Sequence, residues 1–107
     1  MAVIHLDRKE FDEFVVNQEK TIIVEYTAPW CVYCRRIAPI YERLSNEYEE
    51  QLLFGSIDTD QEPQLTEQQL IEVLPTFVVY RDGKAVDSIV APESKVVLEE
   101  LIRENIK

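Results

Sequence analysis

The chain has 107 residues, of which 46% are hydrophobic and 30% are charged, and chains of this length most often form one compact domain. Its 21 acidic and 11 basic side chains leave a formal net charge of −10, which disfavours binding to nucleic acid phosphates or to anionic lipid. No apolar run approaches the roughly 18 residues that cross a bilayer. We therefore expect a single domain over residues 1–107 that is monomeric and binds neither nucleic acid nor a membrane.

The cysteine content and the N-terminus bear on the cellular compartment. Two cysteines are too few for the disulfide framework of a small secreted domain, so the fold must rest on an apolar core. The residues after Met1 contain neither a basic n-region nor the apolar segment of about 7 to 15 residues that marks a secretory signal. The sequence therefore predicts a cytoplasmic protein.

The first half of the chain alternates strand and helix patterns. A strand is expected over residues 3–6, followed by a helix, because Asp7 and Glu10 have the spacing of a capping box. Residues 21–26 are a nearly continuous β-branched and apolar run, which is typical of a central strand buried on both faces. From residue 31 towards residue 50, apolar side chains recur every three or four positions, which predicts a long helix.

The next segment is predicted to be a strand and then a polar connection. Residues 52–57 have the composition of a strand. A short helix is expected within residues 61–71, and Thr66 and Gln69 have the spacing of a second capping pair.

The last third contains a hairpin and a final helix. Strands are expected over residues 76–80 and 84–90, because Asp82-Gly83 between them is typical of a tight antiparallel turn. Ser94 is expected to cap the last helix. The resulting order, β-α-β-α-β-α-β-β-α, predicts an α/β fold in which a mixed sheet is flanked by helices.

The two cysteines are the strongest functional signal. Cys31 and Cys34 lie where the buried strand gives way to a helix N-terminus, the context in which Cys-x-x-Cys is a redox motif. Unpaired N–H groups and the helix dipole favour a thiolate at Cys31. Cys34 lies one turn further along, within bonding reach and less exposed. Arg35 and Arg36 add positive charge nearby.

The predicted chemistry is thiol–disulfide exchange without a bound cofactor. The Cys31 thiolate attacks a substrate disulfide, and Cys34 resolves the mixed disulfide. The alternatives for the pair are a static disulfide or part of a zinc site. A structural zinc site takes about four ligands, whereas the chain offers two cysteines and one histidine. We therefore expect no metal site and interpret His5 as an ordinary strand residue.

The whole chain resembles the thioredoxin family. The resemblance rests on residues 21–39, which include Trp30-Cys31 and Ile37-Ala38-Pro39, and on Leu74-Pro75-Thr76 ahead of the Asp82-Gly83 hairpin. It implies the thioredoxin fold, with a central mixed sheet of four to five strands. It also implies a cis peptide bond before Pro75, protein disulfides as substrates and a separate reductase as the electron donor.

Glu25 is an ionisable residue within the buried strand pattern, where burial raises a carboxyl pKa. The resemblance implies an acid at this position beneath the active site, which accepts a proton from Cys34. It also implies a lysine partner for that acid on the third strand, and we expect the matching position to hold Phe54, which leaves Glu25 without this partner.

The resemblance further implies a substrate-docking patch around Cys31. We expect it to consist of Trp30, Val32, Tyr33, Leu74, Pro75 and Ala91. Two further features depart from the family pattern: Val32-Tyr33 replaces the usual Gly-Pro between the cysteines, and Ala91 replaces a glycine. The reduction potential is therefore open.

Three functions compete at this point. The first is a cytoplasmic protein-disulfide reductase. The second is an oxidant or isomerase of an oxidising compartment, which Glu25 and the Ala-Pro-Trp-Cys run also fit. The third is a thioredoxin-like adaptor that binds a partner protein and uses its cysteines little or bridges a metal cluster between two chains.

Overall fold

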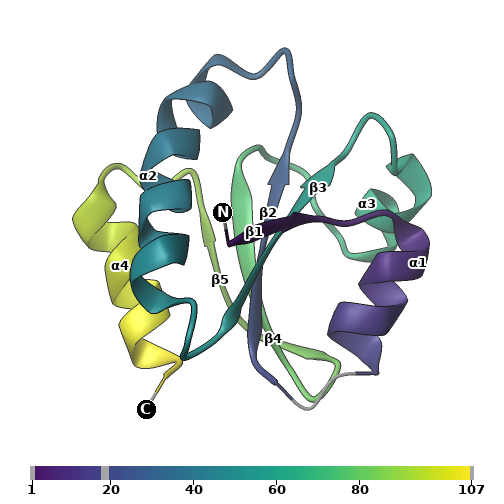
Figure 1. Ribbon diagram of the computed structural model, residues 1–107. Helices are drawn as coiled ribbons and strands as arrows, with labels where there is room; N and C mark the ends of the chain where they lie inside the picture. The colour runs from purple at the N-terminus through teal and green to yellow at the C-terminus, as the bar shows by residue number, and fades with distance from the viewer. Residues whose placement is uncertain (1, 18–19, 107) are drawn as a thin grey trace.

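The structure, a computed structural model, describes residues 2–17 and 20–106. Within these residues five strands form one sheet in the order β1-β3-β2-β4-β5, with helices on both faces (Figure 1). The elements are β1 (Val3–His5), α1 (Arg8–Phe11), a π-helical segment η1 (Asp12–Val16), β2 (Ile22–Thr27), α2 (Val32–Tyr48), β3 (Leu53–Asp58), α3 (Pro63–Gln68), β4 (Thr76–Arg81), β5 (Lys84–Val90) and α4 (Lys95–Glu104).

The sheet is mixed, as the order of elements predicts. Strands β1, β3 and β2 run parallel, whereas β4 is antiparallel to both β2 and β5. The central position belongs to β2, whose residues 22–26 are all buried. Helices α2 and α4 cover one face of the sheet, and α1 and α3 lie on the other (Figure 1). The predicted thioredoxin fold is therefore confirmed.

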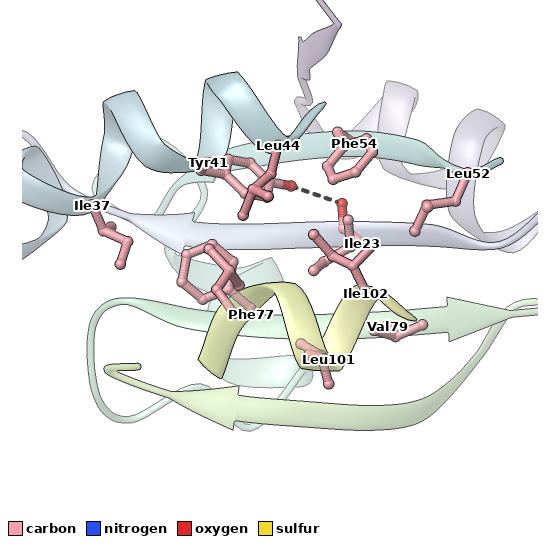
Figure 2. Close-up of a cluster of buried hydrophobic side chains, with 11 residues drawn as sticks. Ile23, Ile37, Tyr41, Leu44, Leu52, Phe54, Phe77, Val79, Leu101 and Ile102 are labelled. Atoms are coloured by element: carbon pink, nitrogen blue, oxygen red, sulfur yellow. Dashed lines mark hydrogen bonds between the residues drawn. The ribbon is translucent and has the colours of Figure 1, made fainter. Parts of the chain in front are cut away.

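Successive side chains of β2 point to opposite faces and so contribute to two cores. Ile23 belongs to the core beneath α2 and α4, while Ile22, Val24 and Tyr26 belong to the other. The buried side chains of the first core, most of them labelled in Figure 2, are Ile23, Ile37, Tyr41, Leu44, Leu52, Phe54, Phe77, Val79, Leu98, Leu101 and Ile102. Because β2 packs against a core on each face, it is held on both sides. Its C-terminal end is therefore a rigid platform for the residues that follow it.

Tyr41 bonds α2 to both β2 and β3 through its hydroxyl group. The hydroxyl lies 3.0 Å from the carbonyl oxygen of Ile23 (Figure 2). It also lies 2.7 Å from the carbonyl oxygen of Gly55. Tyr41→Phe is expected to lower the free energy of unfolding by about 1–2 kcal/mol, because these buried carbonyls lose a donor that water cannot replace. Urea unfolding measures the loss. Tyr48→Phe, at a partly exposed hydroxyl, is the control and is expected to lose less; equal losses would contradict the assignment.

The predicted starts of the first and last helices are confirmed. Asp7 and Glu10 form the capping box of α1, and the Ser94 side chain accepts from the Val97 N–H to cap α4. The predicted hairpin is also present. Both turn residues, Asp82 and Gly83, have positive φ, which is the conformation that a two-residue hairpin turn requires.

The capping pair proposed for α3 is wrong. Thr66 lies inside the helix, where its hydroxyl donates to the carbonyl of Glu62 at 2.7 Å. The helix begins earlier, at Pro63, because proline has the φ of a helix and lacks the N–H that a first-turn residue leaves unpaired. The cap residue, Glu62, makes no side-chain capping bond.

None of the helices described is both long enough and apolar enough to cross a membrane.

Candidate active site

The cysteine pair lies where the platform of β2 meets the start of α2. Four residues separate the last residue of β2 from Val32, the first of α2, and Cys31 is the N-cap. Its backbone is extended, with φ −82° and ψ 109°, and its Sγ accepts a hydrogen bond from the Cys34 N–H at 3.2 Å. The sulfur therefore occupies the position of a capping oxygen, where the helix N–H groups and the helix dipole favour negative charge.

Cys31 and Cys34 form a disulfide, with their Cα atoms 5.2 Å apart. The structure is thus that of the oxidised site. Cys31 is 8% exposed and Cys34 is 2% exposed, which confirms the expectation that the second cysteine is the less accessible. An incoming substrate sulfur reaches Cys31 more easily than Cys34.

Positive charge lies close to the pair. The Arg35 guanidinium donates to the carbonyl of Pro29 at 2.9 Å, so it is held against the loop that precedes Cys31. Arg36 is exposed. An arginine so placed adds to the helix dipole in favouring a thiolate over a thiol.

Glu25 is buried, with 4% of its surface exposed. Desolvation by burial raises its pKa to about 7, and a hydrogen bond from Ser56 partly opposes that rise. Its Oε2 has no hydrogen-bond partner among the described residues. Burial, and then the nearby Glu25, also raise the pKa of Tyr41. The carboxyl is therefore close to half-protonated at neutral pH.

The β2–β3 ladder shows which residue of the third strand lies beside Glu25. In the β2–β3 ladder Phe54 pairs with Ile23, and the residue opposite Glu25 is Ser56. A hydroxyl, rather than the lysine implied by the resemblance, faces the buried acid.

A pocket of about 250 Å³ opens beside Cys34. Its lining includes the Ser56 that bonds Glu25 and the exposed His5. His5 pairs with Ser56 in the β1–β3 ladder, and the sequence pattern gave no sign of this proximity. No group of three or more His, Cys, Asp or Glu side chains in the described part of the chain is placed to hold a metal ion. The pocket thus links the second cysteine to the partner of the buried acid.

The predicted docking residues fall into two groups. Trp30 and Val32 are 65% and 54% exposed on either side of Cys31, and the Trp30 indole donates to Asp60 at 3.2 Å. Pro75 is buried and Leu74 packs partly against the core. The docking role of all six residues stays a prediction, with Trp30 and Val32 the most accessible.

Backbone bonds bring the rest of the predicted rim together. The Leu74–Pro75 peptide bond is cis, as the resemblance implies. The Ala91 N–H donates to the Pro75 carbonyl at 2.8 Å, and the Tyr33 hydroxyl donates to the Pro92 carbonyl. The start of α2, the start of β4 and the end of β5 therefore meet at one end of the sheet.

Ala91 has φ +45°, which is why glycine suits this position. Ala91→Gly is expected to stabilise the fold by about 0.5 kcal/mol, because the left-handed conformation costs an L-residue about 1–2 kcal/mol and glycine loses about 0.5–1 kcal/mol in chain entropy. Ala85→Gly, on β5 at negative φ, is the control and is expected to destabilise. Urea unfolding distinguishes the two, and a loss of stability at both positions would contradict the reason given.

Known proteins match this chain over nearly its full length. The thioredoxin family model matches residues 2–104. The sequence is 36% identical to Thioredoxin 1 of Plasmodium falciparum, over 95% of each chain. It is 36% identical to a thioredoxin of Coprinus comatus, over 89% of this chain and 92% of that protein. A chloroplastic relative, thioredoxin M5 of Oryza sativa, is 31% identical over 94% of this chain and 58% of that protein.

These matches and the bonded cysteine pair agree on the chemistry. A disulfide at a helix N-terminus, in a domain of this kind, belongs to a thiol–disulfide oxidoreductase that reduces protein disulfides. This function is favoured over the oxidant and adaptor alternatives. The chain belongs to the thioredoxin family.

Proposed function

We propose that the reduced protein transfers two electrons to a disulfide of a substrate protein, with Cys31 as the nucleophile. The Cys31 thiolate attacks one substrate sulfur, breaks the substrate disulfide and releases the other sulfur as a thiolate. The Cys34 thiolate then attacks the Cys31 sulfur, which releases the reduced substrate and leaves the Cys31–Cys34 disulfide. The observation that carries this order is the position of Cys31 as the N-cap of α2, more exposed than Cys34.

Glu25 is the proton acceptor for Cys34 in this proposal. Cys34 must lose a proton before it attacks, and an acceptor works best when its pKa lies near the working pH. The raised pKa of Glu25, about 7, meets that condition. Ser56 bonds Glu25 and lines the pocket beside Cys34, so its hydroxyl is placed to relay a proton between the pocket and the carboxylate.

The proposed partners follow from the same cycle. Each turnover leaves the enzyme oxidised, so a separate reductase must return two electrons to the Cys31–Cys34 disulfide. We propose that the chain acts as a monomer in the cytoplasm. Relatives of this chain include a chloroplastic protein, so imaging of the tagged full-length protein in its own cell is the test of location; signal confined to an organelle would contradict the proposal.

A redox titration tests the direction of electron flow. The disulfide is equilibrated against dithiothreitol buffers, and thiols are counted at each potential. A reductase is expected to have a potential near that of reducing members, about −270 mV, whereas oxidants and isomerases lie at about −120 to −180 mV. A value in the second range would support the oxidant alternative and contradict the proposal.

An activity assay tests the reaction itself. With dithiothreitol as the electron source, catalytic amounts of the protein are expected to accelerate cleavage of the interchain disulfides of insulin, followed by turbidity. No acceleration, in protein shown by thiol titration to cycle between dithiol and disulfide, would contradict the proposed function.

A further inference from the structure

A groove of about 560 Å³ runs between the loop that follows α3 and the β4–β5 hairpin. On β5, Ile89 packs against the core beneath α4, whereas Val86, which lies at a bulge in the β4–β5 pairing, and Val90 line the groove. The loop contributes Leu70 and Val73 from the other side. Both walls of the groove therefore carry apolar side chains, with polar ones between them.

These four side chains are exposed to an unusual degree for their type. Leu70 is 85% exposed, Val73 51%, Val86 46% and Val90 52%. Single exposed apolar residues are common on protein surfaces, but a group of them around one concavity is typical of a binding site.

Of these four residues, Leu70 is the one whose conformation and exposure contribute least to the stability of the fold. Its φ is +61°, a left-handed conformation that glycine adopts without strain and leucine does not. The side chain nevertheless buries almost nothing against its own chain. Strain and exposure at one residue, with no gain in packing, point to a use outside the fold itself.

The negative charge around the groove favours a ligand that carries positive charge. Among its described lining residues there are two carboxylates and no lysine or arginine. The Asp87 carboxylate lies on the α4 side of the sheet, where it accepts a hydrogen bond from Asn105, the C-cap of α4, at 3.1 Å. Glu72 is exposed and has no ion-pair partner among the described residues, so it is the carboxylate available to the groove. The chain as a whole carries −10, so a ligand with basic side chains is favoured.

The groove is continuous with the rim of the active site. Val90 pairs with Thr76, the residue after Pro75, and Ala91 is bonded to the Pro75 carbonyl. A polypeptide whose disulfide lies at Cys31 therefore has a path along this end of the sheet into the groove.

We propose that the groove binds an extended segment of the substrate protein, outside its disulfide, in which apolar side chains alternate with lysine or arginine. This proposal rests on the proposed function, since it names the class of substrate that the same site prefers. Leu70 and Val86 contact the apolar side chains, and Glu72 pairs with a basic one.

Matched peptide substrates test the preference. The probes are a short peptide with one intramolecular disulfide, the same peptide extended by Lys-Leu-Lys-Val-Lys at either end, and the same extensions with glutamate in place of lysine. Wild type is expected to show kcat/KM about 5- to 10-fold higher for one lysine extension than for the short peptide, since partial burial of a leucine supplies that much. The glutamate versions are expected to show no gain.

Leu70→Gly and Val86→Ser are the test variants. Each is expected to remove most of the gain and to leave kcat/KM for the short peptide unchanged. Leu70→Gly suits the local backbone, and a thermal melt confirms that each variant is folded. The control is Val96→Ala, at a 64%-exposed apolar residue of α4, which is expected to keep the full gain. No gain in wild type, a gain that survives both variants, or an equal loss on short and extended peptides would overturn the proposal.

Binding without chemistry separates this proposal from the proposed function. The lysine-extended peptide with serine in place of both cysteines is titrated into oxidised protein, and backbone amide shifts are followed by NMR. Shifts at Leu70 and Val86 in a protein that reduces no disulfide would support peptide binding in the groove and contradict the proposed function. Reduction of the short peptide, with no shifts at the groove, would support the proposed function and contradict peptide binding in the groove. Sedimentation showing a dimer that Leu70→Gly dissolves would assign the groove to a second copy and overturn the proposal.

Discussion

Cys31→Ser is expected to abolish catalysis of disulfide reduction, leaving only the rate of the reductant itself. The serine hydroxyl is not ionised at neutral pH, so no nucleophile remains at the N-cap of α2. Cys34→Ser is expected to behave differently: it attacks substrate once and then accumulates as a mixed disulfide, because nothing resolves it. Mass spectrometry of the trapped adduct, with substrate bonded to Cys31, checks both roles.

The matched control for both variants is wild type held fully reduced, since each variant lacks the disulfide. Circular dichroism of the three proteins separates loss of chemistry from loss of structure. A mixed disulfide trapped on Cys34 in Cys31→Ser, together with no adduct in Cys34→Ser, would reverse the assignment of the two sulfurs.

Glu25→Gln is expected to stabilise the oxidised protein at alkaline pH. The pKa of Glu25 is raised from 4.5 to about 7 in the folded state, so the folded protein binds this proton more tightly than the unfolded chain does. The contribution to stability is fully present below pH 4.5, falls as pH rises through about 7, and amounts to about 3 kcal/mol. At pH values above the folded pKa of about 7, the glutamine variant is expected to be more stable than wild type by about this amount.

Urea unfolding from pH 4 to pH 9 measures the effect, with both proteins in the disulfide form. Wild type is expected to lose stability relative to Glu25→Gln as pH rises through about 7, and the two curves are expected to converge near pH 4. Ser56→Ala removes the hydrogen bond that lowers the Glu25 pKa. The pH at which the folded protein loses this stability is therefore expected to rise. Parallel curves for wild type and Glu25→Gln would show that Glu25 titrates normally in the folded state.

The same variant bears on catalysis. Glu25→Gln cannot accept a proton from Cys34, so the resolving step is expected to slow by about 10- to 100-fold near neutral pH, since a general base typically contributes 100-fold or more and pocket water partly substitutes. The attack by Cys31 is expected to be unaffected. Single-turnover kinetics, with the mixed disulfide quenched by acid, separates the two steps; equal slowing of both would contradict the assigned role.

Local sequence signals predicted most of the fold. The capping box of Asp7 and Glu10 and the Asp82-Gly83 turn act over a few residues, so their effect is readable without the tertiary structure. The apolar run of β2 likewise predicts a strand that is buried on both faces, and its side chains do belong to both cores. At α3 the local signals conflict, and Pro63 at the first helical position outweighs the weaker capping pattern of Thr66.

Features set by long-range pairing were not predictable in the same way. Ser56 faces Glu25 because of the β2–β3 register, and His5 reaches the pocket beside Cys34 because β1 pairs with β3. The positive φ of Leu70 has no local signal either, since leucine is a poor indicator of that conformation. The cysteine pair was predictable because its chemistry depends on a strand–helix junction that the sequence itself displays.

The central claim is that Cys31 is held as a thiolate at the N-terminus of α2, and its alkylation rate tests this most directly. Fully reduced protein is reacted with iodoacetamide from pH 4 to pH 9, and each modified cysteine is identified by peptide mapping. A thiol stabilised by this helix end is expected to react with a midpoint below about pH 7.5 and well ahead of Cys34. A midpoint near pH 8.5, or equal rates at the two cysteines, would contradict the claim.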